Sequence, residues 1–133
     1  MTTLAQHIAA LATRIGQELK ARVTPEHPGL ARAWVSFGWE KSHATEHVVI
    51  HAGHNVKKVL RIAPGKYRVV FEVPMPDAHY CWLAFARNSG KTMKMAAARV
   101  NCDDKTTDDV ELVCTTPSGT LADSSEINVV VYR

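Results

Sequence analysis

The sequence predicts a mainly β protein, an antiparallel β-sandwich of about eight strands that follows an N-terminal α-helix. In the first 22 residues the apolar positions are spaced four, three and four apart, which is a helical pattern. From residue 33 the apolar period changes to two, and short apolar runs then alternate with turn-forming segments up to the C-terminus. We therefore expect a helix within residues 1–23, a linker over 24–32 and a β-sandwich over 33–133.

The N-terminal segment has the pattern of an amphipathic helix with a narrow apolar stripe. Thr3 and Gln6 form a capping-box signature at its start, and Pro25 disfavours helical backbone just before it, so we expect a helix from Leu4 to Arg22. The stripe fits positions a and d of a heptad, which favours a bundle of several copies, although packing on the chain's own β-domain is the alternative. The candidate oligomerisation residues are Leu4, Ile8, Leu11 and Ile15.

The linker TPEHPGLAR holds two prolines and a glycine, and the alternating run AWVSF follows it. The strongest local prediction is a hairpin in which NVKKVLRI and YRVVFEV flank the turn APGK. Pro followed by Gly at the centre of a turn is typical of type II, because Gly accepts a positive φ. One face of the second strand should carry Tyr67, Val69, Phe71 and Val73.

The strand HYCWLAFAR is apolar on both faces, with Tyr80, Trp82 and Ala84 on one and Cys81, Leu83 and Phe85 on the other. We expect both faces to be covered, the second one by a neighbouring subunit. PMPDA interrupts the ladder before this strand, because proline donates no backbone hydrogen bond. The runs MKMAAARV, DVELVCT and EINVVVYR predict the remaining strands.

Composition excludes several classes of protein. The net charge is only +3 and the basic residues are scattered, which argues against nucleic acid as a partner. No apolar run reaches the ~20 residues of a membrane span, so we expect no membrane insertion. The three cysteines have no CxxC spacing, and Cys81 and Cys114 are expected to be buried free thiols, which suits assembly in a reducing cytoplasm.

One motif resembles a zinc peptidase site. His43, Glu46 and His47 match H-x-x-E-H, but that chemistry needs a helix and a strand-like run follows at once. We interpret the segment as a His-rich polar loop. His47 and His51 are weak candidates for a metal site in which copies of a residue ring a threefold axis. We expect no other metal and no cofactor.

Other catalytic signatures are incomplete. SGKT lacks the first glycine of a phosphate-binding loop, because Phe85 stands there. The acidic loop around Asp103 lacks the glycine and terminal glutamate of an EF-hand, and no G-x-S-x-G elbow is present. We therefore expect no catalytic residue and no enzymatic activity.

The segments ARAWVSF, HNVKKVLRIAPGKYRVVFEVPMPDAHYCWLAFAR and INVVVYR resemble a β-domain found at the C-termini of bacteriophage tail fibre and related minor virion proteins. The resemblance covers about Ala31 to Arg133. It implies a homotrimer on a virion, assembled in the host cytoplasm, that meets other tail or baseplate proteins and a host surface receptor. Ile at a with Leu at d would favour two helices, but the resemblance implies three.

Within that family, binding would lie in the loops, and a surface glycan or protein would be the ligand. Sugar faces stack on aromatic rings, and Trp39 is the aromatic that strand alternation explains least, although a place in the core or at an interface is the alternative for it. The candidate receptor-binding residues are Trp39, His43, Asn88 and Lys91. The alternatives are a head fibre or capsid decoration protein with a structural role, and a small enzyme or unrelated carbohydrate-binding module.

Overall fold

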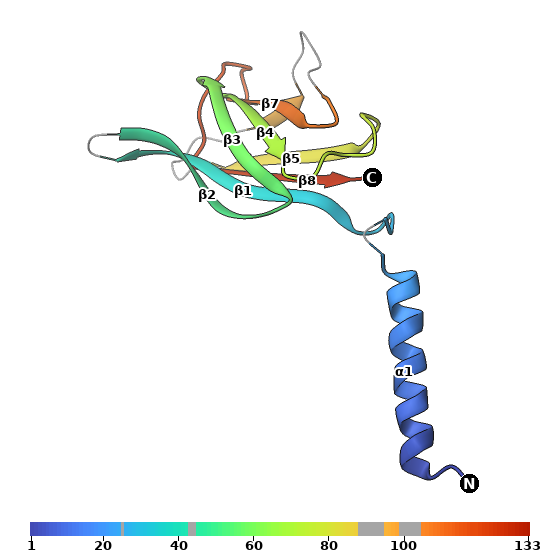
Figure 1. Ribbon diagram of the computed structural model, residues 1–133. Coiled ribbons are helices and arrows are strands. Elements are labelled where there is room, and N and C mark those ends of the chain that lie inside the picture. The colour runs from blue at the N-terminus through green and yellow to red at the C-terminus, as the bar shows by residue number, and fades with distance from the viewer. Residues whose placement is uncertain (25, 43–44, 88–94, 99–104) are drawn as a thin grey trace. The chain divides into compact units, whose positions relative to one another are not determined.

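The computed structural model describes residues 1–24, 26–42, 45–87, 95–98 and 105–133 (Figure 1). The chain divides into two compact units, Met1–Leu30 with the helix and Ala31–Arg133 with the strands. The protein is mainly β, as the sequence predicts, with two antiparallel four-stranded sheets in the second unit.

Helix α1 spans Leu4–Arg22, in agreement with the sequence prediction. The capping box is present, because the Thr3 hydroxyl accepts from the Gln6 N–H at 3.3 Å and the Gln6 side chain accepts from the Thr3 N–H at 2.7 Å. The helix ends where the Val23 N–H donates to Leu19 O, two residues before Pro25. None of its residues is buried. Over the described residues, no helix is long and apolar enough to cross a membrane.

The described part of the β unit contains eight strands in two sheets, with the orders β2-β1-β8-β5 and β3-β4-β7-β6. All pairings are antiparallel. The strands are β1 (Ala31–Ser42), β2 (Thr45–His54), β3 (Val56–Ala63), β4 (Lys66–Phe71), β5 (Cys81–Arg87), β6 (Met95–Ala98), β7 (Asp109–Thr115) and β8 (Glu126–Tyr132).

The predicted β3–β4 hairpin is confirmed. Gly65 has a φ of 70°, the conformation that the turn requires and that glycine adopts without strain. Tyr67, Val69 and Phe71 are buried, as alternation predicts. The prediction for Val73 is wrong, because β4 ends at Phe71 and Val73 lies exposed in the connection to β5. The Val73 N–H donates instead to the Asn55 side chain at 2.7 Å.

The core lies between the two sheets. Two aromatic pairs meet edge to face across it: Phe37 with Tyr67, at 5.3 Å between ring centroids, and Phe71 with Tyr80, at 5.7 Å. The Tyr80 hydroxyl donates to backbone carbonyl oxygens, so burial of this polar group is compensated. Other buried side chains of the core include Val35, Val69, Met75, Val110, Leu112, Ile127, Val129 and Val131.

Strand β5 has one face on the core and one face in the open. Trp82 and Ala84 pack against the core, whereas Leu83 and Phe85 are 49% and 68% exposed. The described residues of this chain therefore do not cover the face of β5 that carries Leu83 and Phe85. The prediction that both thiols are buried is half right, since Cys114 is buried but Cys81 is exposed on the open face of β5.

Candidate functional site at one end of the sandwich

The strand connections gather at two ends of the sandwich, and we call the end where β1 and β5 finish the loop end. β1 and β5 both pair antiparallel with β8, so they run in the same direction. Their last residues, Ser42 and Arg87, therefore lie toward the end where β8 begins at Glu126. The chain enters the β unit at the other end, where Ala31 pairs with Tyr132.

The β3–β4 turn is also part of the loop end, because Asp123 holds it there. The Asp123 carboxylate accepts from Gly65 N–H at 3.0 Å and from the Tyr67 hydroxyl at 2.6 Å. Arg61 donates to both carboxylate oxygens, at 3.0 Å from Nε and 2.7 Å from Nη2. One loop residue thus joins β3, the turn and β4 to the segment that leads into β8.

These contacts shift the pKa values of the Asp123 carboxyl and the Tyr67 hydroxyl. Burial opposes the charge on Asp123, but the hydrogen bonds from Arg61, Gly65 and Tyr67 outweigh it and lower its pKa to about 2. Burial, with the nearby Asp123 carboxylate, raises the pKa of the Tyr67 hydroxyl far above its usual value. Asp123 is therefore a charged acceptor at neutral pH, and its donors leave it poorly suited to act as a base.

Trp39 contacts the group formed by Asp123 and its donors Arg61, Gly65 and Tyr67, which we call the Asp123 cluster. The Arg61 guanidinium carbon lies 4.1 Å from the centroid of the Trp39 ring, which is a cation–π contact. The side chain is half-buried, and its Nε1–H is buried with no hydrogen-bond partner among the described residues. Arg61 therefore covers part of the ring that sequence reasoning assigned to sugar stacking, and Trp39 has a packing role at the loop end.

The segment before β8 packs tightly on β1. The Trp39 N–H donates to Ser124 O at 2.9 Å, and a Cβ added to Gly38 would lie 2.0 Å from the Ser125 carbonyl oxygen. The buried Ser124 hydroxyl donates to Arg87 O at the end of β5. The Asp123–Ser125 segment thus fixes the last described residues before segment 88–94.

The residues of the peptidase-like motif that the structure describes lie in a strand. Glu46 and His47 belong to β2, opposite Lys41 and Glu40. Lys41 Nζ forms an ion pair with Glu46 Oε1 at 2.8 Å, and this ion pair raises the pKa of Lys41. The helical turn that H-x-x-E-H needs is absent over Thr45–His47.

The weak metal candidates are both exposed on β2. His47 lies opposite Glu40, whereas His51 falls in a β-bulge, since Ser36 pairs with Ala52 and Phe37 with Ile50. The bulge interrupts the alternation that would place the two rings on one face. Across the described ranges, no three His, Cys, Asp or Glu side chains are grouped so as to hold a metal ion within one chain.

Three candidate receptor-binding residues, His43, Asn88 and Lys91, lie outside the described residues. The residues that flank them can be placed. Ser42 and Thr45 pair at the end of the β1–β2 hairpin. Arg87 pairs with Glu126 at the same end, and their side chains form an ion pair at 2.7 Å. The residues that flank positions 43–44 and the residue that precedes positions 88–94 therefore lie at the loop end. Trp39 lies at the same end.

Sequence reasoning missed Asp123, the residue that organises this end. It lies in TPSGTLADSS, which has only the composition of a loop. The one available signal was Tyr67, whose hydroxyl follows a core-facing alternation and so needs an acceptor. Nothing in the sequence indicates which acceptor, because 56 positions separate Tyr67 from Asp123.

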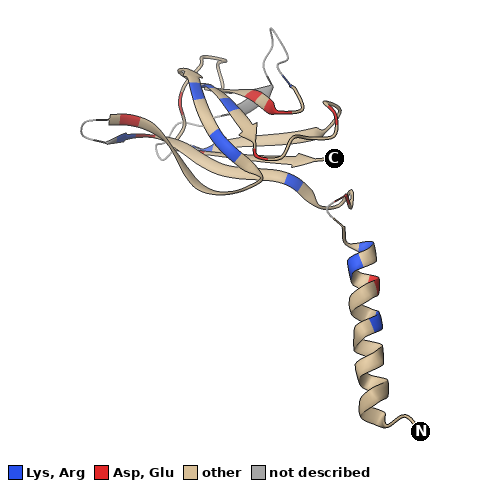
Figure 2. Ribbon diagram, in the orientation of Figure 1, with Lys and Arg blue, Asp and Glu red and all other residues tan. Residues whose placement is uncertain are grey.

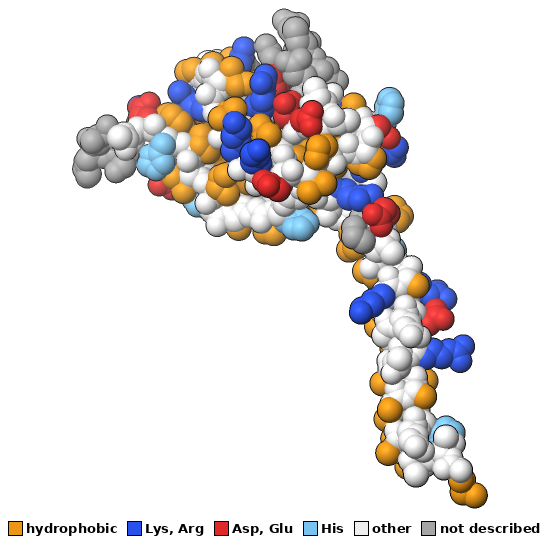
Figure 3. Space-filling view, viewed as in Figure 1, with side chains coloured by type: hydrophobic (Ala, Val, Ile, Leu, Met, Phe, Trp, Pro, Cys, Tyr) orange, Lys and Arg blue, Asp and Glu red, His pale blue; other side chains and the backbone are white. Residues whose placement is uncertain are grey.

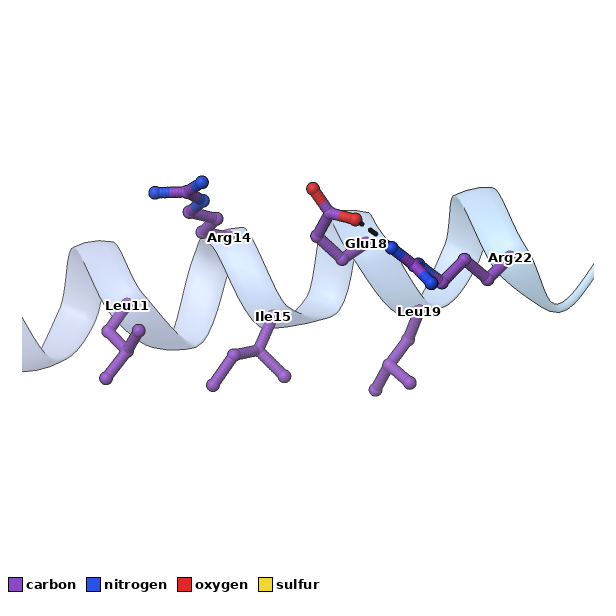
Figure 4. Close-up of a pocket in the computed structure, with 6 residues that line it drawn as sticks. All are labelled: Leu11, Arg14, Ile15, Glu18, Leu19 and Arg22. Carbon is purple, nitrogen blue, oxygen red and sulfur yellow. Dashed lines mark ion pairs between the residues drawn. The ribbon is translucent and has the colours of Figure 1, made fainter.

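Helix α1 carries a second candidate surface. The predicted oligomerisation residues Leu4, Ile8, Leu11 and Ile15 are 50–76% exposed, and Leu19 extends the stripe. Figure 3 shows hydrophobic side chains along one side of the helix. In Figure 4, Leu11, Ile15 and Leu19 form one row, and Arg14, Glu18 and Arg22 form a charged row beside it. Glu18 and Arg22 form an ion pair at 3.5 Å.

No family model matches the chain, and neither a curated protein nor a solved structure matches it.

Proposed function

We propose that the chain is a bacteriophage virion protein, a homotrimeric tail fibre or tail-tip protein that binds a receptor on the host cell surface. Its partners are two further copies, tail or baseplate proteins of the particle, and a host surface glycan. Copies assemble in the host cytoplasm and end in the virion. The observation that carries the proposal is the combination, in one chain, of an uncovered helical stripe with a sandwich whose loop end lies opposite the point of chain entry.

The helix supports self-association. In proteins most of the stability of a helix comes from packing of its amphipathic face, so we expect the apolar stripe of this 19-residue helix to need a packing partner. Within the unit Met1–Leu30 no residue of α1 is buried, and we propose that other copies of the helix cover the stripe. Leu4, Ile8, Leu11 and Ile15 keep the four-three-four spacing along which identical helices interlock.

The loop end supports receptor binding. Sandwich folds display their variable connections at the ends of the strands, where a rigid framework positions them. Here the framework is the Asp123 cluster, which fixes the β3–β4 turn and the start of β8. His43, Asn88 and Lys91 are proposed as the ligand-binding residues, and Trp39 as the residue that supports them. Three such ends on one trimer would raise avidity by about 10²–10⁴-fold over a single weak site.

Adsorption of fluorescently labelled full-length protein to host cells tests this function. Wild type should bind and should compete with phage particles. His43→Ala with Lys91→Ala should reduce binding. The matched control is His79→Ala with Lys57→Ala, which removes one His and one Lys from exposed positions near the opposite end and should leave binding unchanged.

Two outcomes would contradict receptor binding. If the wild-type trimer binds no host that the phage infects, the head fibre or capsid decoration protein becomes the better proposal. If the His43/Lys91 pair and the His79/Lys57 pair have equal effects, the loop end is not the receptor site.

A further inference from the structure

The outer face of the β2-β1-β8-β5 sheet carries an uncharged central band. β1 and β5 both pair with β8, so their outward side chains line up in cross-strand rows. Across β2, β1, β8 and β5, one row holds His54, Trp34, Val130 and Leu83, and the next holds Ala52, Ser36, Asn128 and Phe85. Neither row contains Lys, Arg, Asp or Glu. Charged side chains appear beyond Phe85 only with the Arg87–Glu126 pair at the loop end.

The opposite sheet differs in this respect. Its outward rows are Leu60–Arg68–Glu111 and Lys58–Val70–Asp109, and each contains two charged residues. Figure 2 shows the contrast: β3 carries blue bands, whereas the middle of β1 and β8 is tan. Both outer faces expose apolar side chains, so the lack of charge, and not apolarity alone, distinguishes the first sheet.

The absence of charge indicates what covers this face. Near a symmetry axis each residue meets its own copies, so any charge there would meet a like charge in a desolvated site. An uncharged apolar band avoids that cost. We propose that this face is a self-association surface, and that three copies of it face one another around the threefold axis of the trimer. This inference rests on the proposed homotrimer and assigns its β-domain contact.

The exposed apolar area of the band is smaller than the area that a stable interface buries. Trp34 and Phe85 are 40% and 68% exposed, which leaves roughly 200 Å² of aromatic residue surface for a partner. A stable interface buries about 800 Å² on each side, so the band supplies the apolar centre and its surroundings the rest. Association through α1 would raise the effective concentration of the faces, so that a modest contact is populated.

Cys81 provides a direct probe, because it borders the band on β5 and is exposed in the single chain. In a Cys102→Ser background, with Cys114 buried, a maleimide should report on Cys81. We expect labelling in the wild-type trimer to be at least about tenfold slower than in Ile8→Asp/Ile15→Asp, which lacks the helical contact. Equal rates in trimer and monomer would overturn the inference and leave the trimer itself intact.

A matched pair of double variants provides the second test. Leu83→Glu with Phe85→Glu places two charges on the band, and Leu60→Glu with Ile62→Glu places two on β3 of the other sheet. The control residues have the same spacing and are 41% and 50% exposed, so neither pair opens the core. We expect the first pair to raise the trimer dissociation constant at least about tenfold and the second to leave it unchanged.

The outcomes separate the possible occupants. Equal effects of the two pairs on trimer dissociation overturn the inference. Loss of host-cell adsorption by Leu83→Glu/Phe85→Glu, with trimerisation and Cys81 labelling as in wild type, also overturns it and assigns the face to the receptor. A wild-type protein that is monomeric contradicts both this inference and the proposed homotrimer.

Discussion

Arg61 and Asp123 form a two-pronged ion pair at the loop end, with Nε–Oδ1 and Nη2–Oδ2 distances of 3.0 Å and 2.7 Å. Only about a fifth of each side chain is exposed, at 22% for Arg61 and 21% for Asp123. The same guanidinium covers the Trp39 ring, and the same carboxylate accepts from the β3–β4 turn. This pair therefore connects the strands that frame the proposed receptor site.

Removing the carboxylate should destabilise the β unit. Asp123→Ala leaves the Arg61 charge, the Gly65 N–H and the Tyr67 hydroxyl without their common acceptor, so we expect a loss of about 2–4 kcal/mol in the free energy of unfolding. Urea denaturation measures it. Asp108→Ala, at an exposed residue whose backbone C=O and N–H form its hydrogen bonds, should change stability by less than about 0.5 kcal/mol. Similar losses in the two variants would disprove the proposed role of Asp123.

Asp123 should also make stability depend on pH. Its pKa in the folded protein, about 2, lies below the ordinary value of 3.8, so its contribution is complete above pH 5 and is lost as the pH falls toward 2. A depression of this size corresponds to about 2 kcal/mol. Unfolding curves of wild type and Asp123→Asn should therefore converge between pH 5 and pH 2. A constant difference over that range would contradict the low pKa.

Trp39 should prove to be a structural residue. Trp39→Ala removes a half-buried ring and its contact with Arg61, and we expect a loss of about 1–3 kcal/mol together with a lower melting temperature. Trp39→Phe keeps a ring under the guanidinium and should recover more than half of that loss. If Trp39→Ala melts like wild type and adsorbs to cells less well, the ring contacts the receptor directly.

Gly38 should tolerate no side chain. The Ser125 carbonyl oxygen occupies the place of its Cβ, so Gly38→Ala must displace the segment before β8, and we expect a cost of about 3 kcal/mol. Gly16→Ala is the control, because nothing lies within 4 Å of that Cβ position. In the helix interior it should stabilise α1 by roughly 0.5–1 kcal/mol, visible as increased helical circular dichroism. An unchanged free energy of unfolding in Gly38→Ala would show that the segment before β8 does not pack closely against Gly38.

Local sequence signals predicted the elements well. The capping box at Thr3 and the position of Pro25 gave the bounds of α1, and Pro-Gly in APGK gave the β3–β4 turn. Alternation also identified the buried residues Tyr67, Val69 and Phe71. Each of these features depends on residues a few positions apart, for which the backbone rules are strong.

The errors concern contacts between distant residues. Alternation placed Cys81 on the same face of β5 as Leu83 and Phe85, but it cannot say whether a face is covered. Val73 continued the pattern of β4, yet the chain leaves the ladder at Phe71. The ion pair of Arg61 with Asp123 spans 62 positions, and the composition of the loop gives no sign of it.

The central claim, that this chain works as a homotrimer joined by its helices, is tested most directly by sedimentation equilibrium of the full-length protein. At micromolar concentration we predict three times the 14.7 kDa mass of one chain. Ile8→Asp with Ile15→Asp should shift the mass toward that of one chain while the β unit stays folded. Ala10→Asp with Gln17→Asp places the same charges at the same spacing outside the apolar stripe and should leave the trimer intact. A wild-type mass of one chain at this concentration would contradict the account.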